Sequence, residues 1–197
     1  MARTSGNVCG ILLAAGSGSR FGGGKLTHPL PGSGLPLAVA SWRHLKAAIG
    51  QCCAVVRAGD AALIELLRAE GARVIECDDA NEGMGRSLSC GIRANPYATA
   101  WVVALGDMPA LRTETIGAVA HSLEHGAAIA LPVRGGQRGH PVGFSARFGP
   151  ELSDLRGDAG ARAVLKAHAA SVIELTVDDA GIFADVDTRE DLARMAR

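Results

Sequence analysis

Close to its N-terminus the chain reads Leu13-Ala14-Ala15-Gly16-Ser17-Gly18-Ser19-Arg20-Phe21-Gly22-Gly23-Gly24-Lys25. This glycine-rich stretch directly follows an apolar run, residues 8–13, that is typical of a buried β-strand. Glycines let backbone N–H groups approach phosphate oxygens, and Arg20 and Lys25 add two positive charges beside them. A loop of this kind at the end of a strand suits a triphosphate. The alternative is a surface loop whose two charges are incidental.

The loop differs from two better-known phosphate-binding motifs. A Walker A loop needs glycine where this chain has Ser19, and serine or threonine where it has Leu26. A dinucleotide-binding loop needs a third glycine where this chain has Phe21. It also needs an acidic residue about 20 positions further on, which this chain lacks. The sequence therefore predicts a phosphate site of another kind.

The composition is that of a globular protein. Of the 197 residues, 48% are hydrophobic and 20% charged, and the formal net charge is zero. One domain spanning residues 1–197 is expected. No basic cluster favours a nucleic-acid surface, and no apolar run approaches the roughly 20 residues of a membrane span. Because the N-terminus also lacks a signal-peptide pattern, we expect a cytoplasmic protein.

The five cysteines show no C-x-x-C spacing; they are Cys9, Cys52, Cys53, Cys77 and Cys90. An odd number without that spacing favours neither a disulfide framework nor a zinc site. Since most of them stand in apolar runs, we expect buried thiols in a reducing compartment, with a packing role for Cys90.

Short apolar runs alternate with amphipathic helical patterns along the chain. Strands are predicted at residues 8–13, 54–57, 73–77, 101–105, 127–132, 140–144 and 171–176, with a short one at 182–186. Helices are predicted at residues 61–70, 113–125 and 159–169, and a last one begins with a capping-box-like pair, Thr188 and Asp191. This order predicts an α/β fold of parallel βαβ units with helices on both faces of the sheet. An antiparallel pair is compatible with residues 127–144.

Two acidic positions follow predicted strands, where ligands of such sheets bind. Asp107, in Leu105-Gly106-Asp107-Met108-Pro109, comes after the strand at 101–105, and a carboxylate there suits Mg²⁺. In Asp185-Val186-Asp187-Thr188 the two carboxylates alternate, and Asp187 is better placed at the strand–helix junction. A metal between Asp107 and Asp187 would bridge phosphates. The alternatives are a turn aspartate at 107 and an acidic helix start at 187.

Three further patterns carry polar groups at predicted strand or helix ends. Gly83-Met84-Gly85-Arg86-Ser87-Leu88-Ser89-Cys90-Gly91 opens a helix, and Ser87 there suits a base or ribose. Gly139-His140-Pro141-Val142 and Gly157-Asp158-Ala159-Gly160-Ala161-Arg162 suit the pocket of an acceptor. The alternative for the first pattern is a plain helix start with Ser87 near the cap, and for the last two patterns structural roles fit equally.

One apparent metal motif is set aside. His121-Ser122-Leu123-Glu124-His125 matches H-x-x-E-H, which some zinc proteases use. Helical periodicity places His121 and His125 opposite the apolar stripe formed by Ile116, Val119 and Leu123. Both histidines should therefore face solvent, and no zinc site is expected.

Taken in order, these motifs resemble those of the molybdenum cofactor nucleotidyltransferases, most closely the molybdenum cofactor cytidylyltransferase branch. The resemblance runs from about Val8 to Leu192. It rests on Leu13-Ala14-Ala15-Gly16-x-Gly18-x-Arg20-x-Gly22-x-x-Lys25, Gly83-Met84-x-x-Ser87-Leu88, Gly106-Asp107-x-Pro109, Gly139-His140-Pro141, Gly157-Asp158-x-Gly160-Ala161-Arg162 and Asp185-x-Asp187-Thr188-x-x-Asp191. It implies a Rossmann-like three-layer α/β/α nucleotidyltransferase fold with a mostly parallel sheet. The implied reaction is transfer of CMP from CTP to the terminal phosphate of molybdopterin, with release of pyrophosphate.

The resemblance also implies roles for single residues. Arg20, Lys25 and Asp107 would be catalytic, and Asp107 and Asp187 would hold Mg²⁺. The implied nucleotide-binding residues are Leu13, Ala14, Ala15, Gly16, Gly18, Arg20, Lys25, Gly83 and Ser87. His140, Asp158 and Arg162 would bind the molybdopterin acceptor. An acceptor phosphate is already ionised near neutral pH, so the transfer needs no general base.

The choice of base rests on the methyl group of Ala15 and on Gly83-Met84-Gly85-Arg86-Ser87-Leu88, which also resembles the cytidylyl branch. Relatives that use GTP usually carry Leu-Ala-Gly-Gly where this chain has Leu13-Ala14-Ala15-Gly16, so CTP is expected in preference to GTP. Phe21 and Met108 stand where the family often has Met and Gln. Open alternatives are a guanylyltransferase acting on the same cofactor, a nucleotidyltransferase with another phosphorylated acceptor, and a non-catalytic cofactor-binding chaperone. Delivery to a molybdoenzyme client is compatible with catalysis.

Overall fold

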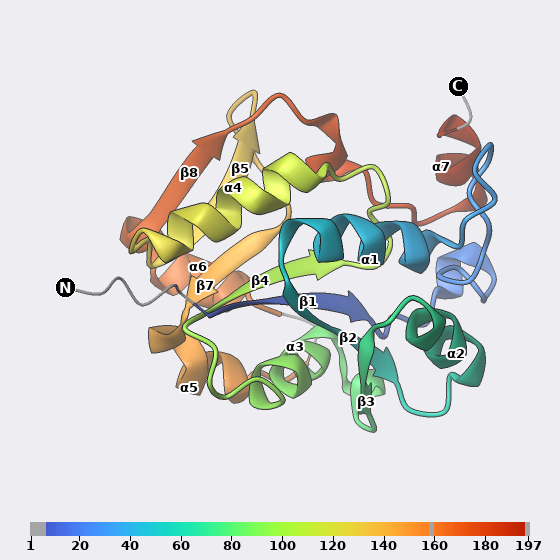
Figure 1. The fold of residues 1–197 in the computed structure, drawn as a ribbon, viewed down its shortest axis with the longest axis horizontal. Coiled ribbons are helices and arrows are strands. Elements are labelled where there is room, and N and C mark those ends of the chain that lie inside the picture. Colours follow the sequence, from blue (N-terminus) through green and yellow to red (C-terminus); the bar gives the residue numbers. More distant parts are fainter. Residues whose placement is uncertain (1–6, 158–159, 196–197) are drawn as a thin grey trace.

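The structure, a computed structural model, describes residues 7–157 and 160–195. Its centre is an eight-stranded sheet with the order β3-β2-β1-β4-β7-β5-β6, in which β8 also pairs with β5 (Figure 1). The strands are β1 Val8–Ala14, β2 Gln51–Arg57, β3 Arg73–Cys77, β4 Ala100–Leu105, β5 Ile129–Arg134, β6 Gln137–Arg138, β7 Val142–Ser145 and β8 Val172–Thr176. The helices are α1 Leu37–Ala48, α2 Ala61–Ala69, α3 Met84–Arg93, α4 Thr113–Glu124, α5 Gly149–Ser153, α6 Arg162–Ala167 and α7 Arg189–Arg194.

The first half of the sheet is parallel, and its strands end at one edge. β1 pairs in parallel with β2 and β4, and β2 with β3. Leu13 of β1 stands beside Val55 on one side and Leu105 on the other. The loops that follow β1 and β4 therefore leave the sheet side by side, which brings Gly16 and Asp107 to the same edge.

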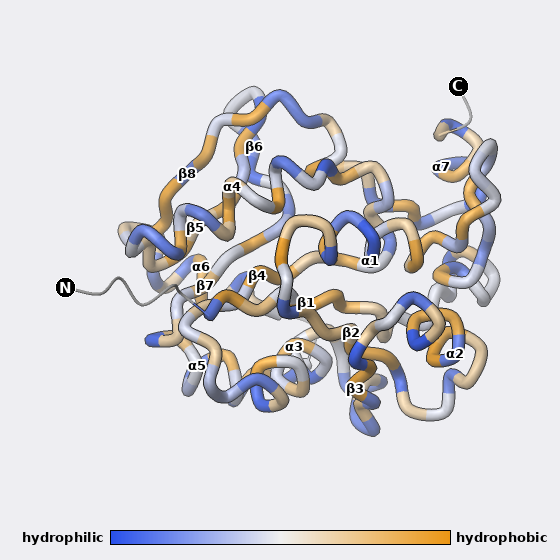
Figure 2. The backbone as a smooth tube through the Cα atoms, in the orientation of Figure 1, coloured by the Kyte–Doolittle hydropathy of each residue, from blue (hydrophilic) through white to orange (hydrophobic). Residues whose placement is uncertain are grey.

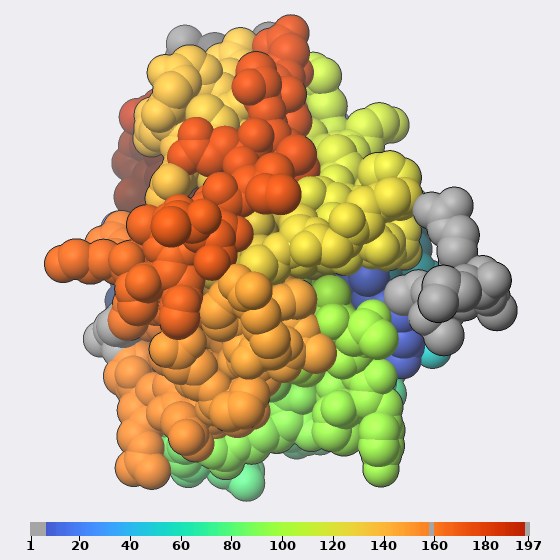
Figure 3. Space-filling view, turned by 90° about the vertical axis from the view of Figure 1, so that its left-hand side faces the viewer, coloured from blue at the N-terminus to red at the C-terminus, as the bar shows by residue number. Residues whose placement is uncertain are grey.

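The second half of the sheet is mixed. β7 runs antiparallel to both β4 and β5, β6 is antiparallel to β5, and β8 is parallel to β5. The predicted α/β fold with a mostly parallel sheet is confirmed, including an antiparallel section within residues 127–144. Figure 3 shows the side of the molecule on which the later part of the chain, coloured yellow to orange, covers most of the surface.

Strand alternation gives two apolar layers, one on each face of the sheet. Leu12 and Ala14 of β1 belong to the layer under α1, α2 and α4, while Ile11 and Leu13 belong to the layer over α3, α5 and α6. All seven residues of β1 are buried, as expected for a strand covered on both faces. Figure 2 shows hydrophobic residues concentrated along the central strands.

The short strand predicted at residues 182–186 is wrong. Residues Ala180–Phe183 form a 3₁₀ turn, and the Asp179 side chain accepts a hydrogen bond from the Gly181 N–H at its start. A Cβ on Gly181 would lie 2.2 Å from the Ala110 carbonyl oxygen, so the backbone here packs directly against the loop after β4. The carbonyl of Ile182 accepts the His140 N–H instead of joining a strand ladder.

The expectation of unpaired thiols is wrong for two cysteines. Cys77, at the end of β3, forms a disulfide with Cys90 of α3. The pair joins consecutive elements that pack together, and a separation of 13 residues has no characteristic spacing that would reveal it. Cys9 and Cys53 are free and buried, as expected, and Cys52 is free and half-buried.

No helix among the described residues is both long enough and apolar enough to cross a membrane.

Candidate active site

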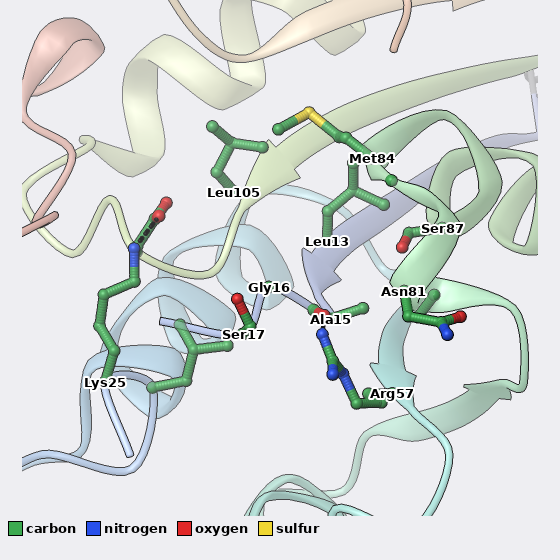
Figure 4. A pocket seen from close by; sticks show the side chains of 14 residues that line it. Leu13, Ala15, Gly16, Ser17, Lys25, Arg57, Asn81, Met84, Ser87 and Leu105 are labelled. Atoms are coloured by element: carbon green, nitrogen blue, oxygen red, sulfur yellow. Dashed lines mark hydrogen bonds and ion pairs between the residues drawn. The ribbon is translucent and has the colours of Figure 1, made fainter. Parts of the chain in front are cut away.

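The glycine loop owes its shape to residues with positive φ. Gly18, Gly22, Gly23 and Gly24 have φ values of 60°, 89°, 89° and 62°, a region that side chains other than glycine rarely adopt. The turn brings the chain back under itself, so that a Cβ on Gly18 would lie 3.0 Å from the Cβ of Lys25. Lys25 is consequently buried at its base and points its ammonium group toward the edge of the sheet (Figure 4).

Four charged side chains meet at this edge. Lys25 Nζ lies 2.7 Å from Asp107 Oδ2 and 3.2 Å from Asp187 Oδ1, and Arg20 Nη1 lies 2.6 Å from Asp187 Oδ2. These residues come from three places in the sequence, and the Val186 N–H donates to the Asp107 carbonyl to hold two of them together. Burial acts to lower the pKa of Lys25, but the hydrogen bonds and charges of Asp107 and Asp187 outweigh it, so the pKa is raised.

Asp187 is positioned by the helix that follows it. Asp191 Oδ2 accepts hydrogen bonds from the backbone N–H groups of Asp187 and Thr188, at 3.2 and 2.8 Å. Thr188 in turn accepts from the Asp191 N–H, which completes the predicted capping box. The role of Asp191 is therefore to fix the backbone at Asp187, and the N-terminus of α7 presents the Asp187 carboxylate to Lys25.

A first cavity of about 300 Å³ opens beside this cluster (Figure 4). It is lined by Leu13, Ala15, Gly16, Ser17, Lys25, Leu26, Arg57, Ala80, Asn81, Gly83, Met84, Ser87, Leu105 and Asp107. The structure thus brings most of the predicted nucleotide-binding residues around one space. Arg57 and Asn81 were not anticipated from the sequence, and Met84 was quoted there only as part of the motif around Ser87.

Three predicted nucleotide-binding residues lie outside that lining. The Ala14 side chain is on the opposite face of β1, where its Cβ would be 3.2 Å from a Cβ on Gly106. Gly18 shapes the loop above Lys25. Arg20 has a side chain that is 75% exposed and contacts Asp187.

A second cavity of about 460 Å³ adjoins the first. Its walls are mainly apolar, and its polar groups are Arg138, His140 and Arg162. Leu13, Met84 and Leu105 line both cavities and form a shared wall. His140 and Arg162, both predicted for the acceptor site, thus line the same cavity. Arg138, which lines the same cavity, was not predicted from the sequence. Asp158, the third residue predicted for the acceptor, lies outside the described residues.

His140 lies in the connection between β6 and β7, at the wall of the second cavity. Its backbone N–H donates to Ile182, and a cis peptide bond joins it to Pro141. Burial lowers the pKa of His140, and the charges of Asp107 and Asp185 oppose that shift without reversing it. His140 is therefore neutral near pH 7. Its Nδ1 atom is buried and has no hydrogen-bond partner among the described residues.

The carboxylates at the edge suit a hard divalent cation. Asp107 Oδ1 is buried and accepts no hydrogen bond from the described residues, and Asp187 lies on the other side of Lys25. The described residues contain no group of three or more His, Cys, Asp or Glu side chains placed to hold a metal. Two carboxylates that need further oxygen ligands match the way Mg²⁺ is shared between a protein and substrate phosphates. His121 and His125, in the motif set aside above, are exposed.

Comparison with known proteins finds a matching family model and several similar proteins. The model of the MobA-like NTP transferase domain matches residues 10–172. Nicotine blue oxidoreductase of Paenarthrobacter nicotinovorans is 32% identical over 197 residues, covering 95% of this chain and 96% of that protein. The crystal structure of Rv0371c from Mycobacterium tuberculosis H37Rv has a TM-score of 0.84 and 28% identity, with 98% of both chains covered. A manganese complex of Rv0371c has a TM-score of 0.77 and 26% identity, covering 96% of this chain and 98% of that one.

Proposed function

The chain belongs to the MobA-like NTP transferase family, and from that premise we propose that it transfers CMP from CTP to the terminal phosphate of molybdopterin, releasing pyrophosphate. One observation carries the proposal: two cavities share a wall, and the charged cluster lies at the edge of the first. A nucleotidyltransferase needs this layout, because donor and acceptor must bind separately and meet at one phosphorus atom.

The first cavity supports the donor assignment. Lys25 and Arg57 supply positive charge to it, and the glycine loop leaves backbone at Gly16 accessible to phosphate oxygens. The Ser87 hydroxyl and the Asn81 amide offer donors and acceptors for a base or ribose. The methyl group of Ala15 also lines the cavity and narrows it, which supports the smaller base of CTP over that of GTP.

The second cavity supports an acceptor that combines a flat apolar body with an anionic end. Its apolar wall includes Leu88, Val103 and Phe144, while Arg138 and Arg162 present guanidinium groups. Guanidinium groups bind phosphate through paired hydrogen bonds, so they suit the terminal phosphate of a pterin.

In the proposed mechanism, an acceptor phosphate oxygen attacks the α-phosphorus of CTP in line with the departing pyrophosphate. Asp107 and Asp187 would hold Mg²⁺, which supplies positive charge to the triphosphate when bound. Lys25 and Arg20 offset the repulsion between the two anions and stabilise the leaving group. Because the nucleophile is already ionised, His140, which is neutral, is not needed as a base.

A second candidate is the same transfer to a different phosphorylated acceptor. The mainly apolar lining of the second cavity favours it, since such a lining accommodates many flat molecules. A purely cofactor-binding chaperone is the weaker candidate, because binding alone does not need Arg20, Lys25, Asp107 and Asp187 gathered at one edge. Screening acceptors against CTP and GTP separates these possibilities.

The test is pyrophosphate release from CTP, GTP, ATP and UTP, with Mg²⁺ and molybdopterin. We expect turnover with CTP, and a loss of about 100-fold or more in kcat for Asp107→Asn, as when a charge-stabilising group is removed from a transfer site. Asp178→Asn is the matched control, because its carboxylate is 95% exposed and pairs with Arg134 at the surface. Normal turnover by Asp107→Asn would contradict the metal assignment, and turnover with GTP alone would move the reaction to the guanylyl type.

A further inference from the structure

Lys25 lies between the carboxylates of Asp107 and Asp187 on one side and the first cavity on the other. Its Nζ atom contacts Asp107 Oδ2 and Asp187 Oδ1, and the same side chain lines the first cavity, where the triphosphate is proposed to bind. A divalent cation requires the two carboxylates, and a triphosphate requires the ammonium group. Neither ligand can make its full set of contacts while Lys25 remains paired with the aspartates.

The carboxylates are almost fully engaged in the structure. Lys25 takes one oxygen of each aspartate, and Arg20 takes the second oxygen of Asp187. Of the four carboxylate oxygens, Asp107 Oδ1 alone has no partner within residues 7–157 and 160–195. Two positive and two negative charges cancel locally. A divalent cation arriving alone is therefore attracted weakly, and so is a triphosphate arriving alone.

We propose that Lys25 is an exchangeable counter-ion: it neutralises Asp107 and Asp187 until a divalent cation arrives, then moves its ammonium group to the triphosphate. The consequence is that metal and nucleotide bind with positive cooperativity, each freeing the contacts that the other requires. This inference rests on the proposed function for the identity of the nucleotide.

Lys25 suits such an exchange better than Arg20, because it contacts both aspartates and also lines the first cavity. The base of the Lys25 side chain is held under Gly18, while four flexible methylene groups carry the ammonium group at the cavity margin. Lys25 is only 9% exposed, whereas the Arg20 side chain is 75% exposed and its pairing is screened by solvent. The coupling should therefore depend mainly on Lys25.

The test measures Mn²⁺ binding without nucleotide, from the electron paramagnetic resonance signal of free Mn²⁺. Lys25→Met removes the competing ammonium group and should bind Mn²⁺ about tenfold or more tightly than the wild type, as expected for loss of a cation within contact of a carboxylate. The same variant should bind CTP more weakly when Mn²⁺ is present. Lys46→Met is the matched control, because Lys46 is exposed and its ammonium group donates to the Gly50 carbonyl. It should change neither affinity.

Opposite changes in the two affinities distinguish the exchange from simpler roles. Equal or weaker Mn²⁺ binding by Lys25→Met would overturn the proposal, since a purely phosphate-binding lysine leaves metal affinity unchanged and a purely structural one lowers both. Lys25→Gln, whose amide can still donate to Asp107, gives the same comparison if the methionine variant does not fold. Failure of the wild type to bind any nucleotide in the presence of Mn²⁺ contradicts the proposed function, while the metal-only comparison still decides whether Lys25 competes with the cation.

Discussion

Burial of one imidazole makes stability depend on pH in a predictable direction. The pKa of His140 in the folded protein lies below its ordinary value of 6.5, because burial disfavours the charged ring. As pH falls below about 6.5 the unfolded chain takes up a proton first, so the free energy of unfolding decreases, by up to about 1.4 kcal/mol per pH unit for this group. The loss continues until pH passes the lower pKa of the folded state.

The measurement is thermal unfolding of the wild type and His140→Asn between pH 7.5 and pH 5, read as the difference in Tm at each pH. The wild type should lose Tm relative to the variant as pH falls. His121→Asn is the control, since His121 is exposed on α4. A constant difference between the wild type and His140→Asn over the whole range would contradict a buried neutral imidazole.

At the level of residues, the sequence predicted the charged groups better than the cavity walls. Arg20, Lys25 and Asp107 stand in or next to glycine-rich motifs that mark strand ends, and these motifs identify them without a structure. Arg57 has no such motif around it, whereas Arg138 lies between Gly136 and Gly139 but in a two-residue strand, β6, that the sequence pattern does not predict. Arg57 is the last residue of β2 and reaches the Ala15 carbonyl across a strand pairing that the sequence does not encode locally.

The close packing of α3 against the sheet depends on Gly91. A Cβ on Gly91 would lie 2.8 Å from Ile11 Cγ2 and 3.0 Å from Val55 Cγ2, both in the buried layer. Gly91→Ala should therefore lower the free energy of unfolding by about 1–3 kcal/mol through overpacking. Gly117→Ala in α4 is the matched control; its Cβ would meet nothing within 4 Å, and the change should stabilise by about 0.5–1 kcal/mol. Urea denaturation checks both, and equal effects of the two substitutions would contradict the close packing of α3.

The cap of α7 couples helix stability to the site. Thr188→Ala removes the side-chain acceptor for the Asp191 N–H and should cost about 1 kcal/mol of stability. Because Asp191 also holds the Asp187 N–H, the same change should weaken Mn²⁺ binding. Ser33→Ala, in an exposed loop, is the control for loss of a side-chain hydroxyl. Unchanged metal affinity in Thr188→Ala would mean that Asp187 does not depend on the cap.

At the level of elements, periodicity and caps were the reliable signals. The buried stripe of α4 and the capping box of α7 are local patterns, and both are confirmed. The error at residues 182–186 arose because a short apolar run has the same sequence pattern in a strand and in a buried loop. Ile182 lies in such a loop, and its carbonyl accepts the His140 N–H. Helix α1 was not predicted. The residues of its first half are small or apolar and are buried, so the sequence there shows no clear polar face.

The disulfide between Cys77 and Cys90 encloses a large part of the first cavity's wall. Ala80, Asn81, Gly83, Met84 and Ser87 all lie within the closed loop. Reduction should lower the free energy of unfolding by up to about 3 kcal/mol on loop-entropy grounds and weaken CTP binding. Denaturation and CTP titration with and without dithiothreitol measure this, and Cys77→Ser, which cannot form the bond, should not respond to the reductant. Identical behaviour of the oxidised and reduced wild type would contradict the prediction.

Across the whole molecule, the two cavities draw on different lengths of chain. Every residue lining the first lies between Leu13 and Asp107, and the charged and polar groups of the second lie between Arg138 and Arg162. The shared wall of Leu13, Met84 and Leu105 belongs entirely to the earlier part. Exchange of the chain after α4 would therefore replace Arg138, His140 and Arg162 together, and Asp187 with them, while the whole lining of the first cavity stayed the same. A chimaera joined at α4 should therefore accept a different acceptor with the same nucleotide, as long as the incoming half supplies an aspartate at the position of Asp187.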